Sequence, residues 1–192
     1  MDMSKISAGK DLPHDFNVVI EIPAQSDPVK YEVDKESGAL LVDRFIGTSM
    51  RYPANYGFIP QTLGDDGDPV DVCVITPFPL LAGSVIRCRP LGMLLMEDES
   101  GGDMKMLAVP VQKLTPRYNK IQTIDDVPED YLAQIRHFFE HYKDLEKGKW
   151  AKVSGWTGPE EACKVIMKGV EAYNNAKSVS YTHLRAHETG AY

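Results

Sequence analysis

The sequence predicts an α+β fold in which strands fill the first two-thirds of the chain and helices follow. Short apolar runs in the first part are bounded by proline, glycine and aspartate, which is the pattern of an antiparallel barrel or sandwich. Two later segments carry the signals of helices. With 192 residues, 43% of them hydrophobic and 26% charged, the chain is long enough for one domain with its own core.

Seven runs are predicted as strands, because each is short, apolar and ended by turn-forming residues. They are residues 16–23, 30–34, 39–46, 70–78, 84–96, 104–111 and 150–156. In the second run, strand alternation places Lys30 and Glu32 on one face and Tyr31 and Val33 on the other. The charged face of that strand is therefore a candidate to line a site.

Two helices are predicted toward the end of the chain. Residues 128–146 carry apolar side chains at helical spacing, and Pro128 suits a first turn. A second helix opens with a capping box between Thr157 and Glu160 and is predicted to end near Asn175. Residues 178–192 continue neither the helical pattern nor any motif, so we interpret them as a non-native or disordered tail beyond a single domain of residues 1–177.

Composition excludes several classes of function. The formal net charge is −7, whereas a general affinity for nucleic acid or anionic membrane needs a basic face. No apolar run approaches the roughly 20 residues of a membrane span, and the N-terminus lacks the apolar core of a signal peptide. Three cysteines without paired spacing indicate reduced thiols. We therefore expect a cytoplasmic protein that binds neither nucleic acid nor membrane.

The motif DDGDPVD at residues 65–71 crowds four aspartates together: Asp65, Asp66, Asp68 and Asp71. Carboxylates this close repel one another unless a cation compensates them. Their hard oxygens suit Mg²⁺, Mn²⁺ or Ca²⁺. A solvated acidic loop is the alternative for this motif taken alone. An EF-hand is excluded, because its glycine and its bidentate glutamate are not at the required spacing.

A second acidic group, residues 97–103, lies in a turn between two predicted strands and can converge on the same metal. Cations and phenols accompany both groups: Lys30, Arg44, Arg51, Tyr52, Tyr56, Lys105, Tyr142 and Lys143. Facing a carboxylate-bound metal, such side chains would offset charge on phosphate oxygens. Taken singly, each lysine or arginine is more typical of surface charge, and each tyrosine is more typical of core packing.

Longer blocks follow one another along the chain: IEIPA (20–24), KYEVDKESGAL (30–40), VDRF (42–45), YPANYGFIP (52–60), DGDPVDV (66–72), EDESGGDMK (97–105) and HFFEHYKDLEKGKW (137–150). Together they closely resemble the family I soluble inorganic pyrophosphatases, specifically the bacterial type. The resemblance covers about residues 10–176, and DGDPVDV is its most specific block. Ala82 replaces a proline of the pattern, and the tail has no counterpart.

The resemblance implies a five-stranded closed barrel of the OB type with two principal helices packed outside. It also implies a homohexamer and the hydrolysis of pyrophosphate to two orthophosphates. The cofactor would be Mg²⁺, several ions per subunit, with Mn²⁺ or Zn²⁺ as substitutes. The reaction would be direct in-line attack by a metal-activated water, without a phosphoenzyme.

The same resemblance assigns roles to individual residues. The general base falls on Asp68, and the metal ligands fall on Asp66, Asp71, Asp98 and Asp103. The phosphate-binding positions fall on Lys30, Arg44, Tyr56, Lys105, Tyr142 and Lys143, with Glu21, Glu32 and Tyr52 in support. A non-catalytic metal-binding module would not need Asp68 or the lysines and tyrosines, and an OB-type nucleic-acid binder would need a basic groove.

Overall fold

The computed structural model of the chain describes the backbone of residues 5–188 and the side chains of residues 5–178. Its strands are β1 (Gly9–Asp11), β2 (Asp15–Ile22), β3 (Val29–Val33), β4 (Leu40–Phe45), β5 (Asn55–Phe58), β6 (Asp71–Val74), β7 (Val85–Asp98), β8 (Gly101–Gly102), β9 (Lys105–Pro110) and β10 (Ala151–Thr157). The helices are α1 (Glu129–His141) and α2 (Pro159–Glu188), with short 3₁₀ turns η2 (Pro116–Tyr118) and η3 (Ile124–Asp126).

Five strands close into a ring of hydrogen bonds. The ring runs from β2 to β5, β6, β9 and β7, and β7 returns to β2. Only the β6–β9 pair within this ring is parallel. Strand β7 spans 14 residues, so one end closes the ring while the other pairs with β10 and β8. The predicted α+β barrel is confirmed, and closure leaves the five strands with few exposed edges.

The strands β1, β5 and β8 were not predicted from the sequence, and the β3–β4 pair lies outside the main sheet. Strand β5 was missed because Gly57 interrupts its apolar pattern, and the same glycine is what lets β5 approach β2. A Cβ atom at Gly57 would lie 1.9 Å from the carbonyl oxygen of Val19. The predicted strands at residues 30–34 and 39–46 do form, as β3 and β4, but they pair only with each other in a separate two-stranded sheet.

Both helices differ from their predicted ends. Helix α1 stops at His141 rather than at residue 146, because the chain then turns, with the Glu146 amide donating to the Lys143 carbonyl at 2.8 Å. Thr157 is the last residue of β10 and not a helix cap, and Pro159 opens α2. Helix α2 continues to Glu188 instead of ending near Asn175, since no proline or glycine interrupts residues 170–188. Residues 189–192 of the predicted tail lie outside the described residues.

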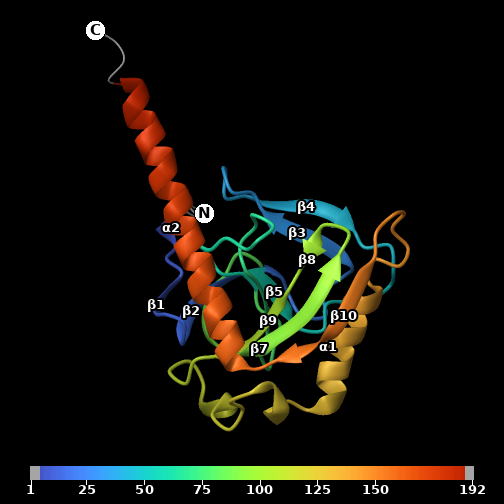
Figure 1. The fold of residues 1–192 in the computed structure, drawn as a ribbon. Coiled ribbons are helices and arrows are strands. Elements are labelled where there is room, and N and C mark those ends of the chain that lie inside the picture. Colours follow the sequence, from blue (N-terminus) through green and yellow to red (C-terminus); the bar gives the residue numbers. More distant parts are fainter. Residues whose placement is uncertain (1–4, 189–192) are drawn as a thin grey trace.

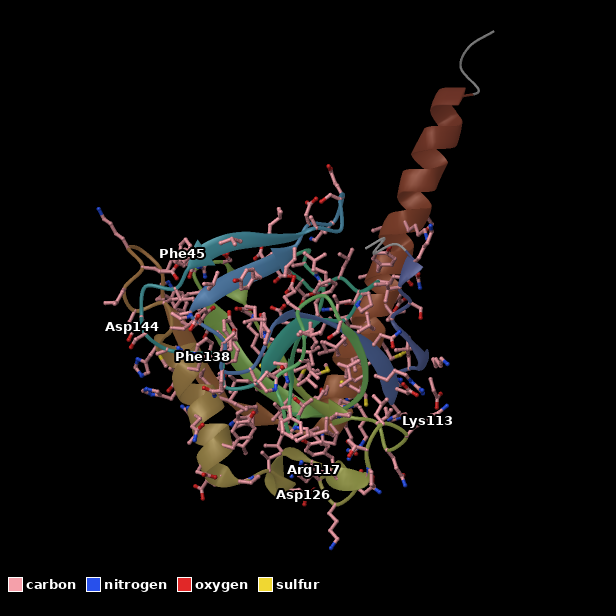
Figure 2. All side chains as sticks on the ribbon, turned by 180° about the vertical axis from the view of Figure 1, so that it is seen from behind. Phe45, Lys113, Arg117, Asp126, Phe138 and Asp144 are labelled. Carbon is pink, nitrogen blue, oxygen red and sulfur yellow. The ribbon has the colours of Figure 1, made fainter. Side chains whose placement is uncertain are left out.

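The two helices cover different sides of the barrel, and the β3–β4 hairpin lies across one end of it (Figure 1). Helix α1 buries Ile135, Phe138 and Phe139 against one core cluster, and α2 buries Ala162 and Ile166 against another. Figure 2 shows Phe138 on the inner side of α1. Neither α1 nor the described part of α2 is long and apolar enough to cross a membrane.

Candidate active site

A cavity of about 550 Å³ is lined from the β3–β4 hairpin, the ring strands, the loop before β6 and the turn after α1. Arg51, which was also named from the sequence, does not line this cavity and instead lies 2.9 Å from Asp27. The structure does bring to the cavity all of the residues to which the resemblance assigns a role. They are Glu21, Lys30, Glu32, Arg44, Tyr52, Tyr56, Asp66, Asp68, Asp71, Asp98, Asp103, Lys105, Tyr142 and Lys143. Residues up to 122 positions apart in the sequence, Glu21 and Lys143, therefore share one chemical environment.

Lys105, at the start of β9, lies at the centre of the acidic groups. Its Nζ donates to Asp71 Oδ2 at 2.6 Å and to Asp103 Oδ1 at 2.5 Å, and its side chain is buried. Burial alone would lower the pKa of Lys105, but the charges of Asp71 and Asp103 outweigh it and raise the pKa. Burial raises the pKa of Asp103, and Lys105 opposes that shift. The ammonium group thus compensates two carboxylates that converge on one point.

Lys143, just after α1, forms a second buried ion pair. Its Nζ lies 2.6 Å from Asp98 Oδ2 and 3.5 Å from Glu99 Oε2. Burial favours the neutral form of Asp98, but the hydrogen bond from Lys143 prevails and lowers the pKa of that carboxyl. Asp98 is therefore held as an anion, with Lys143 at its side.

The β3–β4 hairpin carries two more cations into the cavity. Lys30 contacts Glu32 and lies 3.2 Å from Asp43, and these carboxylates outweigh burial and raise the pKa of Lys30. Arg44 Nε lies 3.2 Å from Glu146 Oε1 in the turn after α1. Both cations are thus oriented by carboxylates, and the Arg44 contact ties the hairpin to the segment that carries Tyr142 and Lys143.

Glu21, on β2, has a buried carboxyl group whose pKa is raised, whereas the pKa of Asp98 is lowered. Burial raises its pKa to about 8, although the Val33 amide donates to its Oε1 at 2.7 Å and opposes that shift. Near neutral pH its carboxyl therefore keeps its proton in the metal-free protein. Through the Val33 amide it also joins β2 to the hairpin.

Three phenols form the apolar wall. Tyr52 and Tyr56 pack with ring centroids 5.1 Å apart, and Tyr142 stacks on Phe138 at 5.2 Å. Burial raises the pKa of all three hydroxyl groups. They are therefore neutral at physiological pH, and a neutral phenol is able to donate a hydrogen bond.

The loop that carries Asp66 and Asp68 is built by local hydrogen bonds. The Asp68 amide donates to Asp66 Oδ1 at 3.0 Å, and the Gly64 amide donates to the Asp68 carbonyl at 2.6 Å. Gly67 takes a φ of 84°, which favours glycine. The loop is seated on α2, where the Leu63 amide donates to the Gly169 carbonyl at 2.9 Å.

The donor set fits a hard divalent cation. Asp71 and Asp103 both reach one ammonium group, so a cation of higher charge has two converging carboxylates there, with Asp66 and Asp98 lining the same cavity. Among the residues that the structure describes, no three histidine, cysteine, aspartate or glutamate side chains form a ready cage. A metal would therefore complete the site by displacing lysine contacts.

Sequence reasoning missed several lining residues, among them Lys35, Gln61, Thr62, Ser100 and Tyr173. Lys35 had a usable signal, because it sits in the turn between two predicted strands that already carried site residues. Tyr173 had none, since only the docking of α2 on the barrel brings it to the cavity.

Comparison with known proteins gives a consistent result. A family model described as inorganic pyrophosphatase matches residues 18–174. An inorganic pyrophosphatase of Ralstonia nicotianae is 65% identical over 173 residues, which are 90% of this chain and 99% of that protein. An inorganic pyrophosphatase of Escherichia coli is 60% identical, over 91% of this chain and 99% of that protein.

A solved structure of an inorganic pyrophosphatase from Coxiella burnetii superposes with a TM-score of 0.85. It is 55% identical in sequence, and the match covers 88% of this chain and 99% of that one. The region matched by the family model ends before residue 178, where the predicted tail begins.

Proposed function

The chain belongs to the family I soluble inorganic pyrophosphatases and hydrolyses pyrophosphate to two orthophosphates, and from this premise we propose which of its residues carry out each part of the reaction. The observation that carries the proposal is the convergence on one cavity of every acid, cation and phenol to which the resemblance assigns a role. The family is Mg²⁺-dependent, and the carboxylates in this cavity have the chemistry that such an ion requires.

Asp66, Asp71, Asp98 and Asp103 would hold Mg²⁺, with Mn²⁺ or Zn²⁺ as substitutes. Bound magnesium supplies acidification of water and neutralisation of phosphate charge. Asp71 and Asp103 support this assignment because both already share one cation, the Lys105 ammonium. When the site fills, that ammonium would be released toward the substrate.

Asp68 acts as the general base. It lines the cavity on the loop between β5 and β6, and its side chain is exposed enough for a carboxylate oxygen to reach a water molecule. It would accept a proton from the attacking water at a carboxylate oxygen while the water attacks phosphorus in line with the leaving phosphate. Since the attack is direct, no residue forms a covalent bond to phosphorus.

The cations and phenols bind the two phosphate groups. Lys30, Arg44, Lys105 and Lys143 would offset negative charge that grows on the departing phosphate. Tyr56 and Tyr142 would donate hydrogen bonds, because their hydroxyl groups stay protonated. Glu21, Glu32 and Tyr52 would support this set: Glu21 through the Val33 amide, Glu32 by orienting Lys30, and Tyr52 by packing on Tyr56.

The substrate is recognised as a pair of phosphates, because the groups assigned here contact phosphate and leave none assigned to a base or a ribose. We also propose that the enzyme acts in the cytoplasm, where its three free thiols would stay reduced. Nucleic acid is not a partner, given the net charge of −7.

Release of orthophosphate from pyrophosphate, measured with Mg²⁺ and with excess chelator, tests the proposal. We expect rapid release with Mg²⁺, almost none with chelator, and little release from ATP under the same conditions. Comparable turnover of ATP and pyrophosphate would contradict the substrate assignment. Binding of Mg²⁺ without any release would indicate a metal-binding module instead.

A further inference from the structure

We propose that Lys35, at the tip of the β3–β4 hairpin, is the first cation that an incoming pyrophosphate contacts. Its ammonium group pairs with Asp68 in the free enzyme and exchanges this partner for the substrate when pyrophosphate arrives. This inference rests on the proposed function and adds a residue to which that function assigns no role. It concerns substrate capture, and Lys35 takes no part in bond breaking.

The exposure of the lining cations singles out Lys35. Its side chain is 64% exposed, whereas the other cations that line the cavity, Lys30, Arg44, Lys105 and Lys143, are between 5% and 25% exposed. An anion that diffuses in from solvent therefore meets Lys35 before it reaches any of the others. The four less exposed cations, Lys30, Arg44, Lys105 and Lys143, also form ion pairs with nearby carboxylates. These ion pairs keep their side chains in place for the bound substrate.

The turn between β3 and β4 fixes the position of Lys35. The Asp34 amide donates to the Ala39 carbonyl at 2.8 Å, the Gly38 amide donates to the Asp34 carbonyl at 2.8 Å, and Asp34 Oδ2 accepts from the Ser37 amide at 2.8 Å. Gly38 takes a φ of 68°. This hydrogen-bonded turn projects Lys35 from the hairpin across the cavity toward the loop that carries Asp68.

Lys35 Nζ lies 2.7 Å from Asp68 Oδ1. An ion pair this exposed contributes little to stability, because water and salt screen both charges. A doubly charged phosphate group therefore competes with Asp68 for the ammonium at small cost. Once the Lys35 ammonium pairs with the substrate, the carboxylate of Asp68 would also be free to face the attacking water.

A positive charge at the mouth of the cavity has opposite effects on the binding of pyrophosphate and of Mg²⁺. Lys35 attracts the anionic substrate but repels Mg²⁺ from the same acidic cavity. Its removal should weaken capture of pyrophosphate and strengthen binding of Mg²⁺ to the free protein. Damage to the fold would weaken both pyrophosphate capture and Mg²⁺ binding. Opposite changes in these two quantities therefore indicate an effect of charge, and not of structure.

The chain offers a matched control in Lys168. Its Nζ lies 2.7 Å from Asp65 Oδ1, and the two side chains are 68% and 76% exposed, compared with 64% and 71% for Lys35 and Asp68. Asp65 and Asp68 belong to the same loop between β5 and β6, but neither Lys168 nor Asp65 lines the cavity. Lys168→Gln thus removes an equivalent exposed ion pair outside the site.

The experiment compares Lys35→Arg, Lys35→Gln, Lys35→Glu and Lys168→Gln with the wild type in the full-length chain. Steady-state kinetics with pyrophosphate are run at fixed free Mg²⁺ and at low and high ionic strength. Titration calorimetry measures Mg²⁺ binding without substrate.

We expect KM to rise roughly threefold to tenfold in Lys35→Gln, further in Lys35→Glu, and to stay near wild type in Lys35→Arg. The kcat of Lys35→Gln should stay within about twofold of wild type, because the residue acts before the chemical step. Its Mg²⁺ dissociation constant should fall by roughly twofold to fivefold. High salt should shrink each difference, and Lys168→Gln should match wild type.

Equal KM values across the charge series, or weaker Mg²⁺ binding in Lys35→Gln, would overturn the proposal while leaving the pyrophosphatase activity of the wild type intact. An effect of Lys168→Gln as large as that of Lys35→Gln would also overturn it. Failure of the wild type to release orthophosphate is a separate result, since it contradicts the proposed function itself.

Discussion

Lys105 shows how the free protein tolerates so many carboxylates in one cavity. Its ammonium group contacts Asp71 and Asp103, and Lys143 does the same for Asp98. Lys143 lowers the pKa of Asp98 against the effect of burial, and Lys105 opposes the rise that burial causes in the pKa of Asp103. A metal held by these acids would therefore compete with the lysines for the same oxygens.

The sharpest test at the residue scale separates the base from the metal ligands. Asp68→Asn keeps the shape of the side chain but cannot accept a proton, so the rate should fall by roughly 10²–10⁴ while Mg²⁺ affinity stays near wild type. Asp71→Asn removes charge from a proposed ligand, so rate and Mg²⁺ affinity should fall together, with partial rescue by more metal. Kinetics over a range of Mg²⁺ concentrations measure both effects.

The opposite pattern would reverse the assignment. If added Mg²⁺ restores Asp68→Asn and not Asp71→Asn, then Asp68 is the ligand and Asp71 the base. Asp65→Asn is the control, since Asp65 lies in the same motif outside the cavity and pairs with Lys168.

Glu21 gives a prediction about pH and stability. Burial raises its pKa from the ordinary 4.5 to about 8, so the folded state keeps a proton that the unfolded chain loses. The contribution of the protonated carboxyl to stability is complete below about pH 4.5 and is lost as the pH rises through about 8. Glu21→Gln cannot ionise, and its amide oxygen can still accept from the Val33 amide. Its stability relative to wild type should rise by an amount of the order of 4 kcal/mol across this range.

Denaturant unfolding with chelator, at several pH values between 4 and 9, measures this gap. Glu36→Gln, at an exposed position of the hairpin turn, should follow wild type. Parallel pH profiles for Glu21→Gln and wild type would show that Glu21 is not held protonated.

Much of the site could be predicted from the sequence, a smaller part from residue spacing and charge and a larger part from the resemblance to a family. Spacing and charge alone indicate the acids of DDGDPVD and the charged face of Lys30 and Glu32. Roles such as those of Arg44 and Tyr142 came only from the resemblance to a family, because each residue taken singly has an ordinary alternative. Lys35 was missed although its place between two predicted strands was a usable signal, because only the structure shows its contact with Asp68 across two loops.

Secondary elements could be predicted where local pattern and tertiary packing agree. The apolar runs that became β2, β6, β7 and β9 were recognised because they are rich in apolar side chains, and most residues of β2, β6 and β9 and half of those of β7 are buried. Element ends were less certain: α1 stops early where the chain turns to place Tyr142 and Lys143 in the cavity. The ring itself depends on pairings between distant segments, such as β2 with β7, which no local window contains.

At the element scale, the end of α2 should be dispensable. Ala162 and Ile166 are buried and the Gly169 carbonyl holds the loop at Leu63, but residues 174–178 are exposed. Removal of residues 178–192 should therefore leave activity unchanged and melting temperature within a degree or two, because a short polar sequence without periodic apolar positions buries little. Calorimetry and the phosphate-release assay measure both quantities.

Truncation from residue 169 is the matched comparison. It removes the acceptor for the Leu63 amide, so both the melting temperature and Mg²⁺ affinity should drop. A loss of several degrees on removal of residues 178–192 alone would show that this segment is structural and does not fit the interpretation as a foreign tail.

The whole molecule combines a closed ring with an open hairpin. Every ring strand is paired on both sides, which favours a rigid frame for Tyr56, Asp71 and Lys105. The β3–β4 sheet is instead attached through side chains, including Arg44 with Glu146 and Lys35 with Asp68. The frame therefore fixes Asp71 and Lys105, whereas two of the proposed substrate cations, Lys30 and Arg44, lie on a hairpin with weaker attachment.

Assembly into a homohexamer is the prediction for the molecule as a whole, and α1 supplies a candidate contact. His137 and His141 lie one turn apart with ring centroids 4.5 Å apart, and both side chains reach solvent. Asp144 Oδ2 lies 2.8 Å from His141 Nδ1 and would offset part of any new charge. If these side chains meet a second copy, acidification from pH 7.5 to 5 should favour smaller species, because histidine is the side chain that gains charge in acid.

Light scattering across this pH range measures the assembly directly. We expect a hexamer at neutral pH that dissociates in acid, and a His137→Gln, His141→Gln double variant whose size no longer changes with pH. A monomer at neutral pH would refute the hexamer. A hexamer that is indifferent to pH would place the subunit contact elsewhere, because two charged imidazoles on each of two facing helices repel one another wherever the interface excludes water.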